Sequence, residues 1–300
     1  MDGNYFMGVS LAILCGILIN VGLLFQKKVI NEIPKENREK HFIRTLIRNP
    51  LWITGFILEY GGGGVTFILA QNYIGPALVP GLMATGYIVL VVGSIRILGE
   101  SLNRTEYLGI VLLIFGILLL GLSALDIQPQ TVREALKSSD TIFRIIAFTA
   151  VMSVLWIVTH IAALKSKRRK GVLMGLSNGF PFGLSNFWIS PLLAIIRIVL
   201  GGKGTTGQVI IFIAACIILI VANLLAIRQI QEAFKFADAH NIIPMQQIAV
   251  QFAPVIYYFS VFSLSPPSSK SVLYIVSGVL FIVVSVFYLS RRQVKLEQID

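Results

Sequence analysis

The chain has 300 residues, of which 56% are hydrophobic and only 13% are charged, and its formal net charge is +11. Soluble globular proteins carry about 25% charged residues, so this composition excludes a soluble protein. A large positive charge also occurs in nucleic-acid-binding proteins, but here the basic residues are spread through the gaps between apolar segments. We therefore expect the lipid bilayer as the main partner, and no nucleic acid.

Apolar segments of about 20 residues recur along the whole chain, and each could cross a ~30 Å hydrocarbon core as an α-helix. There are nine of them, at residues 4–25, 51–73, 76–98, 106–124, 142–164, 171–199, 208–235, 241–264 and 270–290. The gaps between them are too short for an extramembrane domain. The sequence predicts an all-α integral membrane protein in which residues 1–300 form a single polytopic domain, with 291–300 as a tail.

Basic residues gather in alternate gaps between the predicted spans. One side of the membrane receives 19 of the 25, namely Lys27, Lys28, Lys35, Arg38, Lys40, Arg44, Arg48, Arg96, Arg104, Lys165, Lys167, Arg168, Arg169, Lys170, Arg228, Lys235, Arg291, Arg292 and Lys295. The positive-inside rule assigns such a side to the cytoplasm. We predict a multi-pass protein of the cell membrane with its amino terminus outside and its carboxyl terminus in the cytoplasm.

The chain is weakly similar to itself at an offset of 162–164 residues. The matching pairs are Gly8 and Gly171, Gly16 and Gly179, Pro80 and Pro244, and Gly116 and Gly278. Residues 4–124 then form a first repeat, 125–170 a connector and 171–290 a second repeat. Equivalent spans are five apart, which is an odd number, so they cross the membrane in opposite directions. Inverted repeats of this kind are typical of secondary transporters. A chance alignment of glycine-rich helices would leave a membrane protein of any class.

Several motifs of the chain match those of a known family. Residues 51–124 hold a span that opens with Trp52, a Pro-Ala-Leu-Val-Pro segment at 76–80, and a Leu-x-Glu-x-Leu turn around Glu100. The first span ends in a Lys run at Lys27. In these features the chain resembles the EamA-like drug/metabolite transporter (DMT) superfamily, and most closely its NIPA magnesium-transporter branch.

This resemblance implies a secondary transporter without a cofactor, in which Mg²⁺ or another divalent cation is the cargo moved by alternating access. It also allows a homodimer. An exporter of organic cations or small metabolites is the alternative, and a non-transporting membrane scaffold is a more distant one. No nucleophile–base set or metal cluster indicates an enzyme.

An acidic residue, Glu59, lies inside the second predicted span. A charge at this depth costs at least ~2.5–3.5 kcal/mol on insertion scales, so it usually faces the protein interior and has a function. Glu59 is nine residues after Pro50, which is roughly 13 Å along a helix, and the glycines of 61–64 follow it. We predict a cation or proton site here, with Glu59 as the candidate metal ligand. A protonated Glu59 bonded to a neighbouring helix is the alternative.

Asparagines on repeat-equivalent spans could complete such a site. The offset carries Glu59 to the neighbourhood of Asn223, and the other candidates are Asn20, Asn178 and Asn186. An amide oxygen can bind a cation or a polar substrate, although interhelical hydrogen bonding explains such residues equally well.

Two further features concern the pathway through the membrane. Arg228 and Glu232 are four residues apart near the cytoplasmic end of the seventh span, where they can pair. They are the candidate cytoplasmic gate, with a solvated helix end as the alternative. Pro181 lies inside the sixth span and predicts either a broken helix with freed carbonyls or a simple kink.

Overall fold

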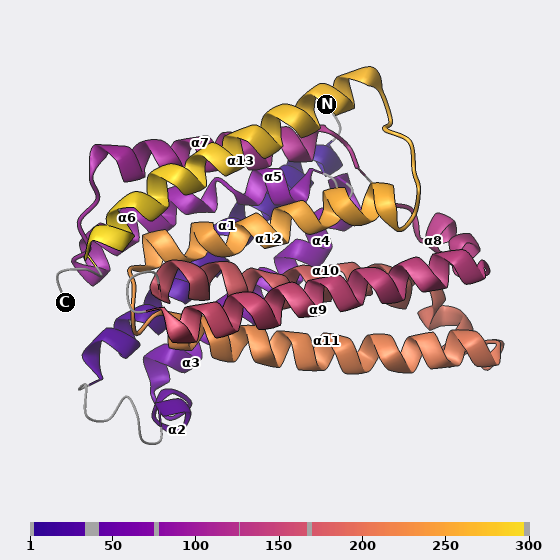
Figure 1. Cartoon of the computed structure of the whole chain (residues 1–300), viewed down its shortest axis with the longest axis horizontal. Coiled ribbons are helices and arrows are strands. Elements are labelled where there is room, and N and C mark those ends of the chain that lie inside the picture. The colour runs from indigo at the N-terminus through magenta and orange to yellow at the C-terminus, as the bar shows by residue number, and fades with distance from the viewer. Residues whose placement is uncertain (1–2, 34–41, 75–77, 126, 167–169, 297–300) are drawn as a thin grey trace.

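The computed structural model describes residues 3–33, 42–74, 78–125, 127–166 and 170–296, with the backbone alone at 3–4 and 290–296. Within these ranges the chain is helical (Figure 1). The elements are α1 (Gly3–Glu32), α2 (Phe42–Leu46), α3 (Pro50–Phe56), the π-helical segment η2 (Ile57–Gly63), α4 (Gly64–Ile74), α5 (Val79–Met83), α6 (Gly86–Leu98), α7 (Arg104–Leu122), α8 (Pro129–Ala135), α9 (Ser139–Lys165), α10 (Lys170–Leu200), α11 (Thr206–Ala233), α12 (Ala239–Ser260) and α13 (Ser269–Leu296).

The helices confirm the prediction of an all-α integral membrane protein. In the described part of the chain, eight helical stretches are long and apolar enough to cross a membrane. The ninth predicted span, 241–264, corresponds to α12. This helix has 22 residues, but a polar stretch from His240 to Gln251 makes it less apolar than the others. Its buried His240 lies against Glu100 and Glu106, as described below.

Local signals in the sequence start several helices. Pro50 occupies the first turn of α3, and the Asn49 side chain accepts hydrogen bonds from the backbone N–H groups of Leu51 and Trp52. Asn103 and Glu106 form a capping box at the start of α7. These contacts satisfy backbone donors that have no partner within the helix.

We call α1–α7 the first half of the bundle and α10–α13 the second half. The end at which Lys27 of α1 and Glu100 meet the α11–α12 turn is called the basic end. The helix α13 also finishes there, because it runs antiparallel to α7 and Leu289 packs against Gly109. The helix α1 begins at the opposite end, where Gly8 packs against Ile74 (Figure 1).

Glycines let backbones touch within each half. A Cβ added to Gly16 would lie 2.3 Å from the carbonyl oxygen of Met83, and one added to Gly179 would lie 2.2 Å from that of Gln246. Both distances are far below van der Waals contact, so no larger residue fits without moving a helix. In the first half these contacts place α1 against the α5–α6 region, and in the second they place α10 against α12.

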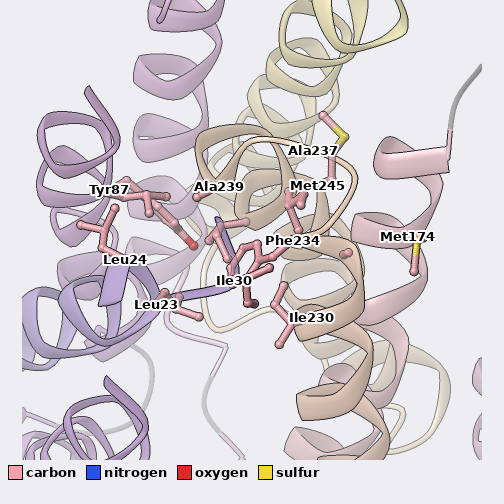
Figure 2. Packing of buried hydrophobic residues seen from close by; sticks show 14 of the residues in the cluster. Leu23, Leu24, Ile30, Tyr87, Met174, Ile230, Phe234, Ala237, Ala239 and Met245 are labelled. Atoms are coloured by element: carbon pink, nitrogen blue, oxygen red, sulfur yellow. The ribbon is translucent and has the colours of Figure 1, made fainter. Parts of the chain in front are cut away.

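Apolar side chains from both halves form one buried cluster near the basic end (Figure 2). Leu24 and Ile30 of α1 are fully buried there, as are Ile230 of α11 and Phe234 after it.

The helix α10 is continuous from Lys170 to Leu200 although Pro181 and Pro191 lie inside it. Of the two alternatives for Pro181, the broken helix is therefore excluded, and α10 packs as one helix against α9, α11 and α12.

Candidate functional site

A cavity of about 430 Å³ lies between the two halves of the bundle. Its walls come from α1, η2 and α4–α7 on one side and from α10, α11 and α12 on the other. Toward the basic end the lining stops at Leu23, Ile230 and Ile243, which belong to the buried apolar cluster. On the other side of Glu59 the lining residue Asn186 is exposed. The volume suits a small hydrated ion or a small organic molecule.

Glu59 lies in the wall of this cavity, on the π-helical segment between α3 and α4. Such π-turns are rare and often occur at functional sites. A glycine of α1 brings the segment close: a Cβ on Gly22 would lie 2.4 Å from the Gly55 carbonyl and 2.9 Å from the Glu59 backbone nitrogen. Of the four glycines that follow Glu59, Gly61–Gly63 complete the π-helical segment, whereas the close backbone approach is made by Gly22 and Gly55.

The Glu59 carboxylate has one defined protein partner and lies among groups able to bind a cation. Gln26 of α1 donates a hydrogen bond from Nε2 to Glu59 Oε2 at 2.5 Å. Asn20 and Tyr60 also line the cavity, and the buried Asn20 Oδ1 has no hydrogen-bond partner. An unpartnered buried oxygen costs free energy, which a bound water, ion or substrate would recover.

The opposite wall of the cavity is polar at several positions. Asn223 of α11 donates from Nδ2 to Ser185 Oγ at 2.7 Å and to the Leu219 carbonyl at 2.8 Å. Both amide hydrogens are then used, which leaves Oδ1 as an acceptor. Asn186 lines the same wall, together with a row of glutamines on α12: Gln246, Gln247 and Gln251.

Of the asparagines predicted for the site, Asn178 does not line the cavity. Its side chain is fully buried between α10 and α11, where Nδ2 donates to the Ala226 carbonyl at 2.6 Å. It therefore serves helix packing. Asn20, Asn186 and Asn223 share the cavity with Glu59. In the described residues, no group of three His, Cys, Asp or Glu side chains is placed to hold a metal ion.

The predicted gate pair does not lie on the cavity. Arg228 and Glu232 form an ion pair at 3.1 Å along one face of α11, but their side chains are 69% and 28% exposed. This exposure fits the alternative of a solvated helix end. The neighbouring Gln231, which is 1% exposed, is the residue of this segment that faces the first half.

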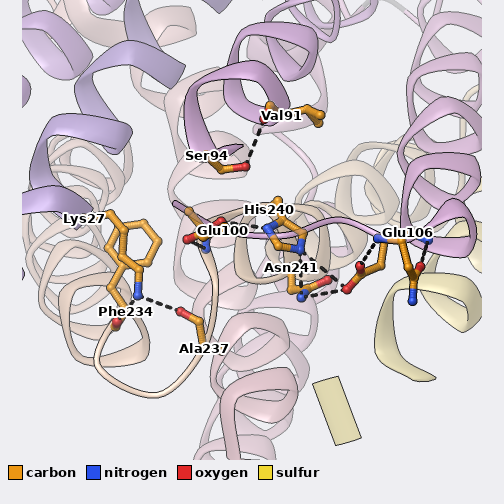
Figure 3. Close-up of polar contacts among 11 residues, drawn as sticks. Lys27, Val91, Ser94, Glu100, Glu106, Phe234, Ala237, His240 and Asn241 are labelled. Atoms are coloured by element: carbon orange, nitrogen blue, oxygen red, sulfur yellow. Dashed lines mark hydrogen bonds and ion pairs between the residues drawn. The ribbon is translucent and has the colours of Figure 1, made fainter. Parts of the chain in front are cut away.

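The basic end is closed instead by buried polar contacts between the two halves (Figure 3). Lys27 donates from Nζ to the carbonyls of Phe234 and Ala237, which belong to the α11–α12 turn. The first span was predicted to end at residue 25, and Lys27 was assigned to a cytoplasmic loop. Instead α1 continues to Glu32, because the buried ammonium has backbone carbonyls to bind.

A fully buried histidine adds a second contact between the halves. His240 Nδ1 lies 2.7 Å from Glu100 Oε2, and Nε2 lies 3.5 Å from Glu106 Oε1 (Figure 3). Glu100 also accepts the backbone N–H of Ala239 at 2.9 Å. Two carboxylates around one imidazole favour its cationic form. In the same turn, burial raises the pKa of Asp238, and the nearby Glu100 carboxylate raises it further.

Sequence reasoning did not find this closure. Lys27 was assigned to a cytoplasmic gap and Trp52 was noted only as the opening of the second span, while Gln26 and Gln231 carried no pattern of their own. The available signal was polarity at a depth where helices are normally apolar: Gln26 and Lys27 follow directly on an apolar run, and His240–Asn241 precede one.

A bundle of membrane-length helices around a polar cavity, closed at one end by contacts between two halves, is the architecture of a membrane transporter. The model of the family described as "Magnesium transporter NIPA" matches residues 3–295. The chain therefore belongs to the NIPA magnesium transporter family. No curated protein and no solved structure matches it.

Proposed function

We propose that the protein moves Mg²⁺ or another divalent cation through the cavity by alternating access. The observation that carries the proposal is Glu59, the one acidic side chain among the described residues that line the cavity. Mg²⁺ is bound in proteins by one or two carboxylates and keeps several of its waters. Six waters at ~30 Å³ each occupy roughly 180 Å³, so the cavity of about 430 Å³ has room for a hydrated ion.

Two equivalent contacts support the proposed inverted repeat. Gly16 meets Met83 in the first half, and Gly179 meets Gln246 in the second; both residues of the second pair are 163 positions after those of the first. Gly116 and Gly278, a pair matched in the sequence, touch each other across α7 and α13. Halves built alike but oppositely oriented can exchange a state closed at one end for a state closed at the other. The described structure is the state closed at the basic end.

An organic cation is the second candidate cargo. Phe67, Tyr87 and Phe182 line the cavity alongside Glu59, and aromatic rings next to a carboxylate bind ammonium groups. The decisive experiment is transport by the purified protein in vesicles, with a panel of divalent cations and amines and with empty vesicles as the blank. We expect Mg²⁺ or another divalent ion to be transported. Amine transport without any divalent transport would replace the proposal with the second candidate.

We also propose that the basic end faces the cytoplasm, because most Lys and Arg residues lie there. The turn between α10 and α11 then lies outside. In intact cells, an impermeant maleimide should label Lys203→Cys, which is exposed in that turn, but not Arg48→Cys, which is exposed between α2 and α3. The wild-type chain is the control, since Cys15 and Cys216 both lie within helices. Labelling of Arg48→Cys alone would reverse the orientation.

A further inference from the structure

A continuous chain of side-chain hydrogen bonds joins Glu59 to the closed basic end. Trp52 Nε1 donates to Gln231 Oε1 at 3.0 Å, and Gln231 Nε2 donates to Gln26 Oε1. Gln26 Nε2 in turn donates to Glu59 Oε2 at 2.5 Å. Trp52, Gln26 and Gln231 are all buried. The chain crosses between the halves twice, because Gln231 is on α11 and its two partners are on α3 and α1.

The direction of this chain is set by chemistry at one end. An indole N–H can only donate, so Gln231 must turn its oxygen toward Trp52 and its NH₂ group toward Gln26. Gln26 must then accept with its oxygen and present its own NH₂ group to Glu59. The carboxylate therefore has to accept, and it does so best when it is ionised, because a charge-assisted hydrogen bond is about twice as strong as a neutral one.

We propose that Gln26 and Gln231 are positioning residues that couple the occupancy of Glu59 to the closure of the basic end. This inference rests on the proposed function. The negative charge of Glu59 strengthens the hydrogen bond that Gln26 donates to it. A cation bound at Glu59 partly neutralises that charge and so weakens this hydrogen bond. Hydrogen bonds in a chain polarise one another, so weakening the first bond also weakens the contact between Gln26 and Gln231. When no cation is bound and Glu59 is ionised, the hydrogen-bond chain therefore stabilises the closed basic end. Binding of a cation at Glu59 favours its opening.

Thermodynamic linkage makes the coupling measurable from both sides. If Mg²⁺ weakens the closure by some factor, the closure must weaken Mg²⁺ binding by the same factor. Breaking the chain should then open the basic end in the absence of Mg²⁺ and also tighten Mg²⁺ binding. A residue with only a structural role would, when removed, loosen the site and lower the affinity.

The test measures alkylation of a cysteine placed in the closure. Ala237 is 7% exposed in the α11–α12 turn, and the reagent should reach Ala237→Cys in purified protein only when the basic end opens. We expect Mg²⁺ to raise the alkylation rate severalfold. In Gln231→Leu, the rate without Mg²⁺ should already be raised severalfold, the response to Mg²⁺ should shrink, and the Mg²⁺ dissociation constant should fall by a similar factor. Gln26→Leu should behave in the same way.

Gln229→Leu is the matched control. Gln229 is a buried glutamine on the same helix, but its partners Trp156, His160 and Ser177 do not belong to the first half. This variant should keep the parent's response to Mg²⁺. If Gln231→Leu and Gln26→Leu also keep it while the parent transports Mg²⁺, the coupling proposal is wrong and the proposed function stands. If the parent shows neither transport of Mg²⁺ nor a response to it, both fail.

Discussion

Replacing Glu59 with glutamine is expected to abolish most cation transport while leaving the protein in the membrane. The side chain keeps its shape and can still accept the hydrogen bond from Gln26, but its charge is gone. A divalent ion about 5 Å from a carboxylate, with one water between them, is attracted by about 7 kcal/mol at an effective dielectric constant of ~20. Losing even half of that attraction is more than a hundredfold in affinity, so initial transport rates in vesicles should fall by at least tenfold.

Accumulation of Glu59→Gln should be normal or improved, because the substitution removes the cost of placing a charge within the bilayer. Asn223→Ala provides a graded comparison. It deletes a neutral group on the opposite wall and should reduce transport less than Glu59→Gln does. Full transport by Glu59→Gln at every pH from 5 to 8 would exclude Glu59 as the site of the transported charge.

Removing the imidazole of His240 is expected to open the basic end. In His240→Gln, the buried carboxylates of Glu100 and Glu106 lose the imidazole that lies between them and have no cation to compensate their charge. Breaking a buried ion pair costs about 3–5 kcal/mol, and 3 kcal/mol is more than a hundredfold in an equilibrium constant. Alkylation of Ala237→Cys in this background should therefore rise strongly, with or without Mg²⁺.

Two further variants separate charge from general damage. Adding Glu100→Gln to His240→Gln removes one uncompensated carboxylate and should restore much of the closure, since a glutamine oxygen can still accept the N–H of Ala239. Glu232→Gln removes a carboxylate from the exposed pair with Arg228, where the cost is at most about 1 kcal/mol. Equal effects of Glu232→Gln and His240→Gln would contradict the assignment of the closure to His240.

Much of the fold could be predicted because the bilayer imposes a simple rule on the sequence. Helix length and hydrophobicity follow from membrane thickness, and capping residues such as Asn49 and Asn103 mark where helices start. Glu59 could be found for the same reason, since a carboxylate in an apolar run is conspicuous. Asn223 was a candidate because the proposed repeat offset carries Glu59 to it, and Asn20 and Asn186 were candidates because they lie on spans that the repeat makes equivalent.

The closure could not be predicted, because it depends on which side chains meet across the halves. Arg228 and Glu232 have the spacing of an ion pair, and they form one, but spacing on a single helix does not say which face meets another helix. Gln231, one residue before Glu232, has no such pattern and yet contacts Gln26 at a separation of 205 residues. Asn178 shows the same limit: its place on α10 was foreseen, but not its turn toward Ala226.

The close contact between α7 and α13 determines how the molecule can move. A Cβ added to Gly109 of α7 would lie 2.8 Å from the Leu289 side chain, and one added to Gly116 would lie 2.9 Å from the Gly278 carbonyl oxygen, both on α13. The glycines of α1 likewise pack this helix tightly against the other helices of the first half. We therefore expect α1 to move together with that half. In the alternating-access cycle proposed above, the two halves are expected to pivot where they are already in contact along their length. The α7–α13 contact is therefore the expected pivot, and the cavity, which no described residue of α13 lines, is expected to open and close away from it.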